Sequence, residues 1–114
     1  MPEIRLEKHD VVATVTLSNP GKLNALNVAM WDALRSTFLK LSEDQSLRCV
    51  IVRGDSENFA AGADVEEFAT VRSTMAQGIH YHTETVANAL RAISHCQHPT
   101  VAAIEGVCVG GGLE

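Results

Sequence analysis

Hydrophobic and polar residues alternate at the start of the chain in a pattern that predicts a β-hairpin. Residues 4–9 alternate apolar and polar side chains, and residues 11–17 are rich in β-branched types. His9-Asp10 separates the two runs, so we expect two antiparallel strands joined by a short turn. Residues 18–22 contain asparagine, proline and glycine and are expected to form a loop.

The next apolar residues recur at the spacing of an amphipathic helix over residues 27–41. One face of this segment is apolar and the other is polar. The apolar positions are Met30, Trp31, Leu34, Phe38 and Leu41. Asn27 is expected to cap the start of the helix, and residues 42–46 to end it. Residues 48–53 then read as a compact buried strand closed by Gly54. A strand, a helix and a strand in this order indicate a parallel crossover and an α/β fold.

The segment after this strand is expected to be a cap followed by a short turn. Asp64 suits the N-cap position of a turn that runs through Phe68. Glu66 and Glu67 are expected to belong to a solvated turn, with a role at the lip of a substrate site as the alternative reading.

A longer helix is predicted between about residues 73 and 94. Its apolar side is expected to carry four residues, namely Ile79, Val86, Leu90 and Ile93. His98-Pro99 should break it, because proline disfavours the helical conformation in the residue before it. The apolar run of residues 101–104 predicts another buried strand. A glycine turn at residues 110–112 follows, and a helix is expected to start at Leu113.

Composition limits the class of protein. The chain has 114 residues, of which 46% are hydrophobic and 20% charged, as in ordinary globular domains. The net charge of −5 and the lack of a Lys/Arg run argue against nucleic acid as a partner. No apolar run is long enough for a bilayer, and the N-terminus lacks an apolar signal core. Cys49, Cys96 and Cys108 have no Cys-x-x-Cys spacing, which indicates free thiols in a reducing compartment. We therefore expect a soluble, cytoplasmic protein without a membrane partner.

Two turns of small residues, at 60–63 and 110–112, each follow a predicted strand. Where such strands are neighbours, their turns emerge at one edge of the sheet, which is where α/β folds commonly bind ligands. Glycine lets a ligand approach the backbone closely, and two converging N–H groups suit an oxyanion. The alternative is that small residues only permit close packing, and the spacing does not decide between the two.

Other candidates for chemistry are weaker. The glycines complete neither a dinucleotide fingerprint nor a phosphate loop, and no Gly-x-Ser-x-Gly elbow occurs. Cys108 is expected to be a small core residue. His80 and His82 should point in different directions on their helix. The group of His95, Cys96 and His98 lacks a second ligand pair at zinc spacing, so we expect no metal site.

Three segments carry a resemblance to a known family. Asn24-Ala25-Leu26, residues 59–64 (FAAGAD) and residues 104–114 (IEGVCVGGGLE) resemble successive signatures of the enoyl-CoA hydratase/isomerase, or crotonase, family. Their order matches as well, and the resemblance covers essentially the whole chain. It implies an α/β fold of the crotonase type, a spiral of ββα units. It also implies that residues 1–114 are the N-terminal part of a single catalytic domain. That domain is incomplete at its C-terminus, because family hydratases carry a second glutamate and further helices beyond this point.

The resemblance implies an acyl-CoA thioester as substrate and no prosthetic group. The N–H groups of Ala63 and Gly111 match the family's oxyanion hole. Glu114 matches the glutamate that handles water when a 2-enoyl-CoA is hydrated to a 3-hydroxyacyl-CoA, and it is expected to lie near an apolar acyl pocket. The alternative for Glu114 is a helix-terminal residue favoured by the helix dipole. Double-bond isomerisation and an inactive acyl-CoA-binding fragment are the alternative functions.

The resemblance also implies a set of residues along the coenzyme A moiety, contacted mostly through the backbone. They are Lys22, Asn24, Ala25, Leu26, Ala61, Gly62 and Asp64. Lys22 is expected either to contact a phosphate or to be a solvated loop lysine. The full-length family members imply a homotrimer or hexamer.

Overall fold

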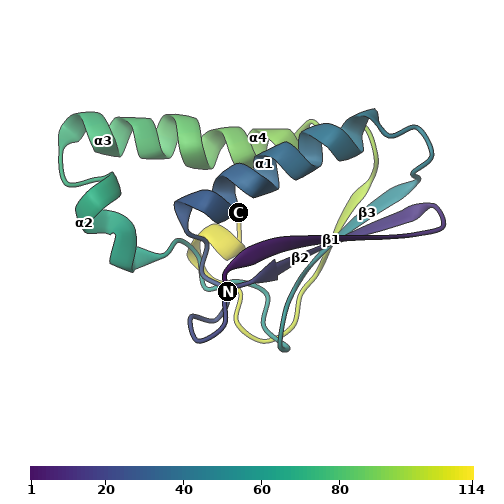
Figure 1. Cartoon of the computed structure of the whole chain (residues 1–114), viewed down its shortest axis with the longest axis horizontal. Helices are drawn as coiled ribbons and strands as arrows, with labels where there is room; N and C mark the ends of the chain where they lie inside the picture. The colour runs from purple at the N-terminus through teal and green to yellow at the C-terminus, as the bar shows by residue number, and fades with distance from the viewer.

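A four-stranded sheet with the order β1-β2-β3-β4 forms one layer of the computed structural model, which describes residues 1–114 (Figure 1). β1 (Glu3–His9) and β2 (Val12–Ser18) are antiparallel. β3 (Cys49–Gly54) and β4 (Thr100–Ala103) continue the sheet as parallel strands. The predicted hairpin and the parallel crossover are therefore confirmed.

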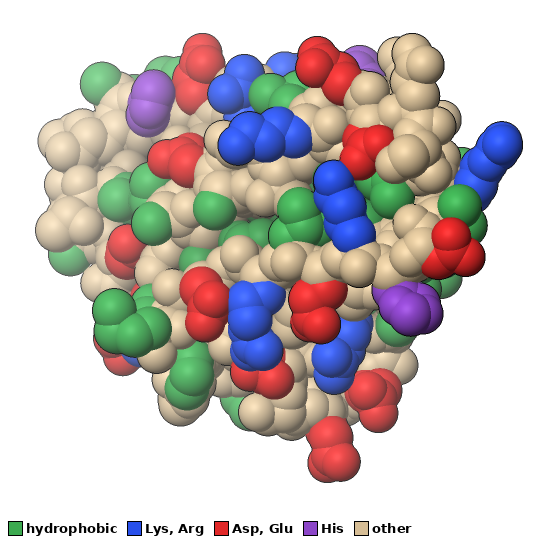
Figure 2. Space-filling model, turned by 45° about the vertical axis from the view of Figure 1, so that its right-hand side comes forward, with side chains coloured by type: hydrophobic (Ala, Val, Ile, Leu, Met, Phe, Trp, Pro, Cys, Tyr) green, Lys and Arg blue, Asp and Glu red, His purple; other side chains and the backbone are tan.

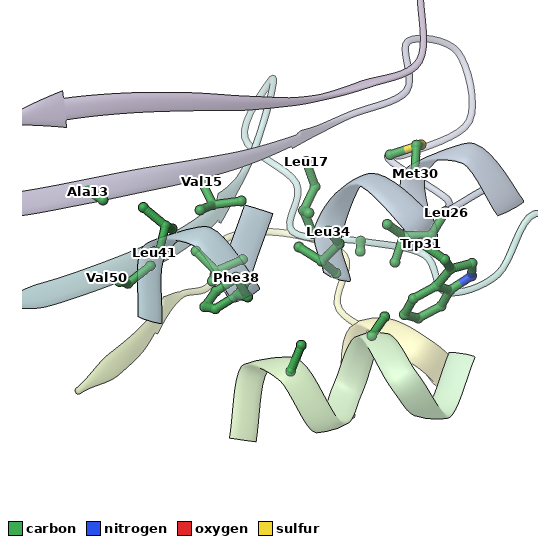
Figure 3. Close-up of a cluster of buried hydrophobic side chains, with 14 of the residues drawn as sticks. Ala13, Val15, Leu17, Leu26, Met30, Trp31, Leu34, Phe38, Leu41 and Val50 are labelled. Atoms are coloured by element: carbon green, nitrogen blue, oxygen red, sulfur yellow. The ribbon is translucent and has the colours of Figure 1, made fainter. Parts of the chain in front are cut away.

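Helix α1 (Val28–Glu43) covers the sheet and supplies much of the core. The Asn27 side chain accepts a hydrogen bond from the Met30 N–H at 2.8 Å, as expected of an N-cap. All five apolar residues predicted for its inner face are buried. They pack against Val15 of β2 and Val50 of β3 (Figure 3). The helix continues two residues past the predicted end, and the Asp44 N–H closes it on the Leu41 carbonyl.

The helical region after β3 consists of two short pieces followed by one continuous helix over residues 75–94, which confirms the helix predicted between about residues 73 and 94 (Figure 1). It comprises η1 (Val65–Glu67), α2 (Phe68–Val71), α3 (Met75–His80), the π-helical η2 (Tyr81–Val86) and α4 (Ala87–Ser94). The predicted apolar side is wrong at Ile79, whose side chain is 55% exposed. The i→i+5 bonds of a π-helix change the angular relation between the residues on either side of it. Tyr81, Ala89 and Ala92 are the buried residues instead, while Val86, Leu90 and Ile93 are half-buried.

Strand β4 forms where it was predicted, but the prediction that it is buried is wrong. All of its residues are exposed, and Ile104 lies beyond the strand with its side chain 54% exposed. β4 is the edge of the sheet, so only β3 lies beside it, and no helix packs closely on it. β3 is half-buried with a strict alternation, because only Val50, Val52 and Gly54 face the core.

The three cysteines are free and half-buried, as the sequence predicted. No helix of the structure is both long enough and apolar enough to span a membrane.

Candidate active site

The two turns of small residues lie side by side, as predicted. The chain beyond β3 and the chain beyond β4 remain paired through a parallel bridge between Ala60 and Cys108. The Ala60 N–H donates to the Val107 carbonyl at 3.1 Å, and the Val109 N–H donates to the Ala60 carbonyl at 3.2 Å. The pairing of β3 with β4 is thereby extended up to the glycines.

Gly62 and Gly111 approach each other across the two turns. A Cβ atom on Gly62 would lie 3.2 Å from the Gly111 nitrogen, and one on Gly111 would lie 3.5 Å from the Gly62 Cα. Gly62 also has φ +101°, a left-handed conformation that side chains disfavour. The contact is therefore one of backbone against backbone, and the left-handed conformation makes glycine the favoured residue at position 62.

Two backbone donors flank this contact without a partner. The residues on either side of Ala63 are bonded to Leu26, whose N–H donates to the Gly62 carbonyl at 2.7 Å and whose carbonyl accepts from the Asp64 N–H at 2.9 Å. The N–H groups of Ala63 and Gly111 donate to no acceptor within the chain. Both residues are half-buried, and Ala63 lines one cavity while Gly111 lines another. Unpaired backbone N–H groups suit an anion or a developing oxyanion.

Trp31 lies directly beneath the second turn. Its Cη2 and Cζ2 atoms would both lie 3.3 Å from a Cβ on Gly111, so the indole ring contacts the glycine backbone. The side chain is fully buried in the core, and its Nε1 has no hydrogen-bond partner. This contact makes helix α1 the support of the Gly111 donor.

A network of asparagine side chains joins the three segments of the candidate site. The Asn24 amide donates to the carbonyls of Asp55 and Asn58 at 2.8 and 3.0 Å, and its oxygen accepts from the Asn19 N–H. The Asn58 side-chain oxygen accepts from the Val107 N–H at 3.0 Å. Asn24, predicted to contact coenzyme A, thus uses its side chain within the fold. The roles of Asn19 and Asn58 were not predicted. The only feature of the sequence that could have indicated them is that each asparagine lies in a loop next to one of the candidate motifs.

Lys22 is bound by two carboxylates at the rim of the first turn. Its Nζ lies 3.0 Å from Asp64 Oδ2 and 2.8 Å from Glu66 Oε2. The hydrogen bond to Glu66, followed by that to Asp64, raises the pKa of Lys22 above its usual value. Lys22 is therefore a loop lysine that is ion-paired and still partly exposed, with 37% of its side-chain surface accessible to solvent. Asp64 also caps η1 by accepting from the Glu66 N–H at 3.1 Å, as predicted.

Most residues expected along coenzyme A line one surface cavity of about 360 Å³. They are Lys22, Ala25, Ala61 and Asp64, and Ala63 of the predicted oxyanion site lines the same cavity. The predicted Leu26 and Gly62 are buried and contribute backbone bonds behind the cavity wall.

The prediction that Glu67 belongs to a solvated turn is wrong. Its carboxylate accepts a hydrogen bond from the Val28 N–H at 2.8 Å, which ties η1 to the start of α1. A carboxylate at a helix N-terminus is stabilised by the unpaired N–H groups there.

Glu114 follows the glycine turn and is exposed. It lies at an apolar cavity of about 150 Å³ together with Trp31 and Gly111. Residues Gly110–Gly112 form a 3₁₀ turn, and Leu113 after it has right-handed helical backbone angles, so the helix start expected at Leu113 stays a prediction. The backbone N–H of Glu114 donates to the Gly110 carbonyl at 3.4 Å.

The other candidates for chemistry remain outside this site. Cys108 is half-buried against the core, as predicted, and its Sγ donates to the Gly112 carbonyl at 3.5 Å. His98 shares a hydrogen bond with the Asp44 carbonyl at 2.9 Å. No group of three His, Cys, Asp or Glu side chains is arranged to hold a metal ion.

Aromatic side chains pack between α2 and the π-helical segment η2. Tyr81 is buried and lies edge-on to Phe68, with the ring centroids 6.2 Å apart, and burial raises the pKa of the Tyr81 phenol. The Arg72 guanidinium stacks over the Phe68 ring at 3.6 Å. These contacts hold α2 against the π-helical segment.

Comparison with known proteins agrees with this arrangement of motifs. The sequence profile of the family described as Enoyl-CoA hydratase/isomerase matches residues 7–114. The chain is 33% identical over 111 residues to a protein named probable enoyl-CoA hydratase echA8 from Mycobacterium tuberculosis, covering 97% of this chain and 41% of that protein. It is also 33% identical over 116 residues to the mitochondrial Delta(3,5)-Delta(2,4)-dienoyl-CoA isomerase of Rattus norvegicus, covering 95% of this chain and 35% of that protein.

The fold is shared with solved structures. A structure described as an enoyl-CoA hydratase/carnithine racemase from Magnetospirillum magneticum superimposes with a TM-score of 0.92 at 44% identity, over 96% of this chain and 41% of that one. A putative enoyl-CoA hydratase/isomerase family protein from Hyphomonas neptunium gives 0.90 at 37% identity, over 99% and 43%. The chain thus spans about two fifths of the length of these relatives. Across that span it has the crotonase fold and belongs to the enoyl-CoA hydratase/isomerase family.

Proposed function

We propose that this protein binds an acyl-CoA thioester and hydrates a 2-enoyl-CoA to a 3-hydroxyacyl-CoA. The observation that supports it most is the pair of unpaired N–H groups, Ala63 and Gly111, on either side of the Gly62–Gly111 contact. Two donors on rigid turns are suited to the carbonyl oxygen of a thioester, which gains negative charge as an enolate forms. One such donor contributes about 3–4 kcal/mol to the stabilisation of an acyl-transfer transition state.

The rest of the substrate has a place near these donors. The cavity lined by Lys22, Ala25 and Ala61 adjoins Ala63 and would hold the coenzyme A portion. Lys22 would reach a phosphate only by leaving Asp64 or Glu66, so we expect its contribution to coenzyme affinity to be small.

Glu114 is the general base of the proposed reaction. Its carboxylate would accept a proton from a water molecule whose oxygen adds to the β-carbon of the enoyl group. Glu114 would then return this proton to the α-carbon of the enolate, which restores the thioester carbonyl and the ionised carboxylate. Glu114 follows Gly111 by three residues, and its exposure leaves it open to water. Residues 1–114 would be the N-terminal part of a single catalytic domain, in a protein that forms trimers or hexamers and acts in the cytoplasm.

Double-bond isomerisation is the second candidate. The observation behind it is the 33% identity to a protein named dienoyl-CoA isomerase, which equals the identity to the protein named hydratase. Isomerisation uses the same oxyanion site but returns a proton to a different carbon and consumes no water. The third reading, an inactive fragment that binds acyl-CoA, requires the cavity and the donors but not Glu114.

Mixing the protein with crotonyl-CoA and following the loss of enoyl absorbance tests the proposal. We expect turnover that Glu114→Gln abolishes without weakening thioester binding. Ala63→Pro removes one donor and leaves both hydrogen bonds of Leu26 in place, so kcat should fall about 10²- to 10³-fold.

Three results would count against it. Turnover that Glu114→Gln leaves unchanged would remove the proposed base. Conversion of a 3-enoyl-CoA without hydration of crotonyl-CoA would favour the isomerase. Calorimetric binding of a thioester without either reaction would favour the inactive fragment.

A further inference from the structure

A polar groove lies between α1 and α4, away from the glycine turns. It encloses about 190 Å³ and is lined by Arg35 and Ser42 from α1 and by Asn88 and Arg91 from α4, with His95 just beyond the end of α4. Leu39 of α1 and Ala92 of α4 also line it, so each helix contributes polar residues and one apolar residue to the groove. The fold thus brings together two arginines that are 56 positions apart in the sequence (91 − 35).

The charge of this groove is not balanced within the chain. Arg35 makes no ion pair and no side-chain hydrogen bond, and Arg91 donates only from Nη1, to Asn88 Oδ1 at 2.6 Å. No Asp or Glu lines the cavity. The carboxylate of Glu84 accepts from the Asn88 amide at 3.4 Å and forms no ion pair with either guanidinium. The sequence has no basic run, so this cluster is visible only in the fold.

In Figure 2, the Lys and Arg side chains over the upper part of the molecule are interspersed with Asp and Glu side chains. Three basic residues elsewhere, Arg5, Lys8 and Lys22, are each matched by carboxylates. Arg35 and Arg91 are among the six of the nine basic residues that form no ion pair, and these two line the same hollow. Like charges that face one hollow repel each other, and a bound anion would turn that repulsion into attraction.

The donors of the groove fit an oxyanion with several oxygens. Guanidinium groups present paired N–H donors that match phosphate and carboxylate, and each bond is charge-assisted. The Ser42 hydroxyl already accepts from the Gln97 N–H at 3.0 Å, so its own hydrogen remains free to donate. The His95 imidazole, which has an N–H in either tautomer, adds a further donor.

The size of the groove limits the ligand. A volume of about 190 Å³ is several times the roughly 30 Å³ of a water molecule, so one phosphate group fits with a few waters. We propose that this groove is a binding site for a single phosphate group, either inorganic phosphate or the terminal phosphate of a monoester.

The proposal is independent of thioester hydration, because none of these residues lines the cavity next to Ala63 or the one next to Glu114. A titration of ¹⁵N-labelled protein with inorganic phosphate tests it by NMR. We expect saturable shifts confined to the amides around Arg35 and of residues 88–95, and to the arginine Nε–H signals. Phosphate should also raise the melting temperature, since a ligand that binds only the folded state stabilises it.

Arg35→Gln and Arg91→Gln should each weaken phosphate binding by about tenfold or more, the effect of one charge-assisted hydrogen bond. Arg48→Gln is the matched control, because this arginine is exposed and lies outside the groove. It should bind phosphate like the native protein. The melting temperature of each variant without phosphate establishes that it is folded.

The comparison of anions separates the possible sources. Phosphoserine that binds as well as phosphate would identify a monoester group as a ligand, and much weaker binding would restrict the site to the inorganic ion. Equal shifts with chloride at matched ionic strength would overturn the proposal, as would equal losses in Arg48→Gln and Arg35→Gln. Unsaturable shifts with phosphate would overturn it as well.

Discussion

Strands β3 and β4 look alike in sequence but differ in their surroundings. Each is a short apolar run followed by a turn of small residues, and each leads to one of the two unpaired N–H groups of the candidate site. β3 has a neighbour on both sides and buries every second residue. β4 lies at the edge of the sheet and buries none. The difference lies in their neighbours along the sheet and not in their composition.

The two arms of the site are consequently held in different ways. The arm after β3 is fixed by backbone hydrogen bonds to Leu26 on both sides of Ala63 and by the Asn24 amide. The arm after β4 depends on its pairing with the first arm and on the contact between Gly111 and Trp31. An apolar run therefore predicts a strand, whereas its position in the sheet decides how firmly the following turn is held.

The largest expected effect comes from Trp31, which supports the second arm. Trp31→Ala should lower the free energy of unfolding by about 3–5 kcal/mol, because a buried aromatic side chain is replaced by a cavity. Urea denaturation followed by circular dichroism measures this loss. In the folded variant, the backbone amide shift of Gly111 should change more than that of Ala63.

Trp31→Phe serves as the control and should retain most of the stability, because an aromatic ring still fills the space below Gly111. Equal changes at Gly111 and Ala63 in Trp31→Ala would contradict the view that the two arms are supported separately.

A matched pair of valines compares the two strands directly. Val50 of β3 is completely buried, whereas Val101 of β4 is 49% exposed. Val50→Ala should cost about 2 kcal/mol through lost burial and a new cavity, and Val101→Ala less than about 0.5 kcal/mol. Urea midpoints at constant slope report both values. A loss at Val101 as large as at Val50 would mean that β4 is covered in solution.

The smallest expected effect is on the stability of the protein at acidic pH, and it comes from Asp55 in the loop that follows β3. The hydrogen bond from the Ser18 hydroxyl at 3.0 Å, together with the Arg5 guanidinium, lowers the pKa of Asp55 from its usual value of 3.8. A lowered pKa contributes stability above the unfolded value, and that stability is lost as the pH falls through the folded value. Asp55→Asn should therefore flatten the loss of stability below about pH 4, as measured by melting temperature against pH.

Asp44 provides the matched control at the far end of the sheet. Its pKa is held well below the usual range by Lys8 and Ser46, so Asp44→Asn should flatten the same limb. Asp55→Asn should also loosen the Asn24 loop, whereas Asp44→Asn should not. An unchanged acid limb in both variants would rule out this account of acid unfolding.

Sequence patterns predicted best where one physical requirement dominates. The amphipathic period of α1 placed all five inner residues correctly, because a helix packed on a sheet buries one continuous stripe. The second helical region failed at Ile79, because local spacing does not reveal the π-helical turn at Tyr81–Val86. The burial of β4 failed for another reason, since an apolar run carries no information on whether a strand is central or at an edge.

The sequence predicted those parts of the candidate site that are short runs of consecutive residues. The residues at 60–63 and 110–112 were expected to meet, and they do. The contact of Trp31 with Gly111 and the bond from Val107 to Asn58 were not predicted, because both join segments far apart in the chain. The ion pairs of Lys22 with Asp64 and Glu66 also join segments far apart in the chain and were not predicted.

The contact of Gly62 with Gly111 has a consequence for mutational screens. The two donors beside it belong to the backbone, so truncating side chains leaves them in place. Alanine scanning skips Ala63 altogether and, at Gly111, adds an atom instead of removing one. A screen of that kind would score this region as a steric constraint on glycine and miss its polar groups. Only the replacement of an amide by an ester or by proline interrogates the N–H groups themselves.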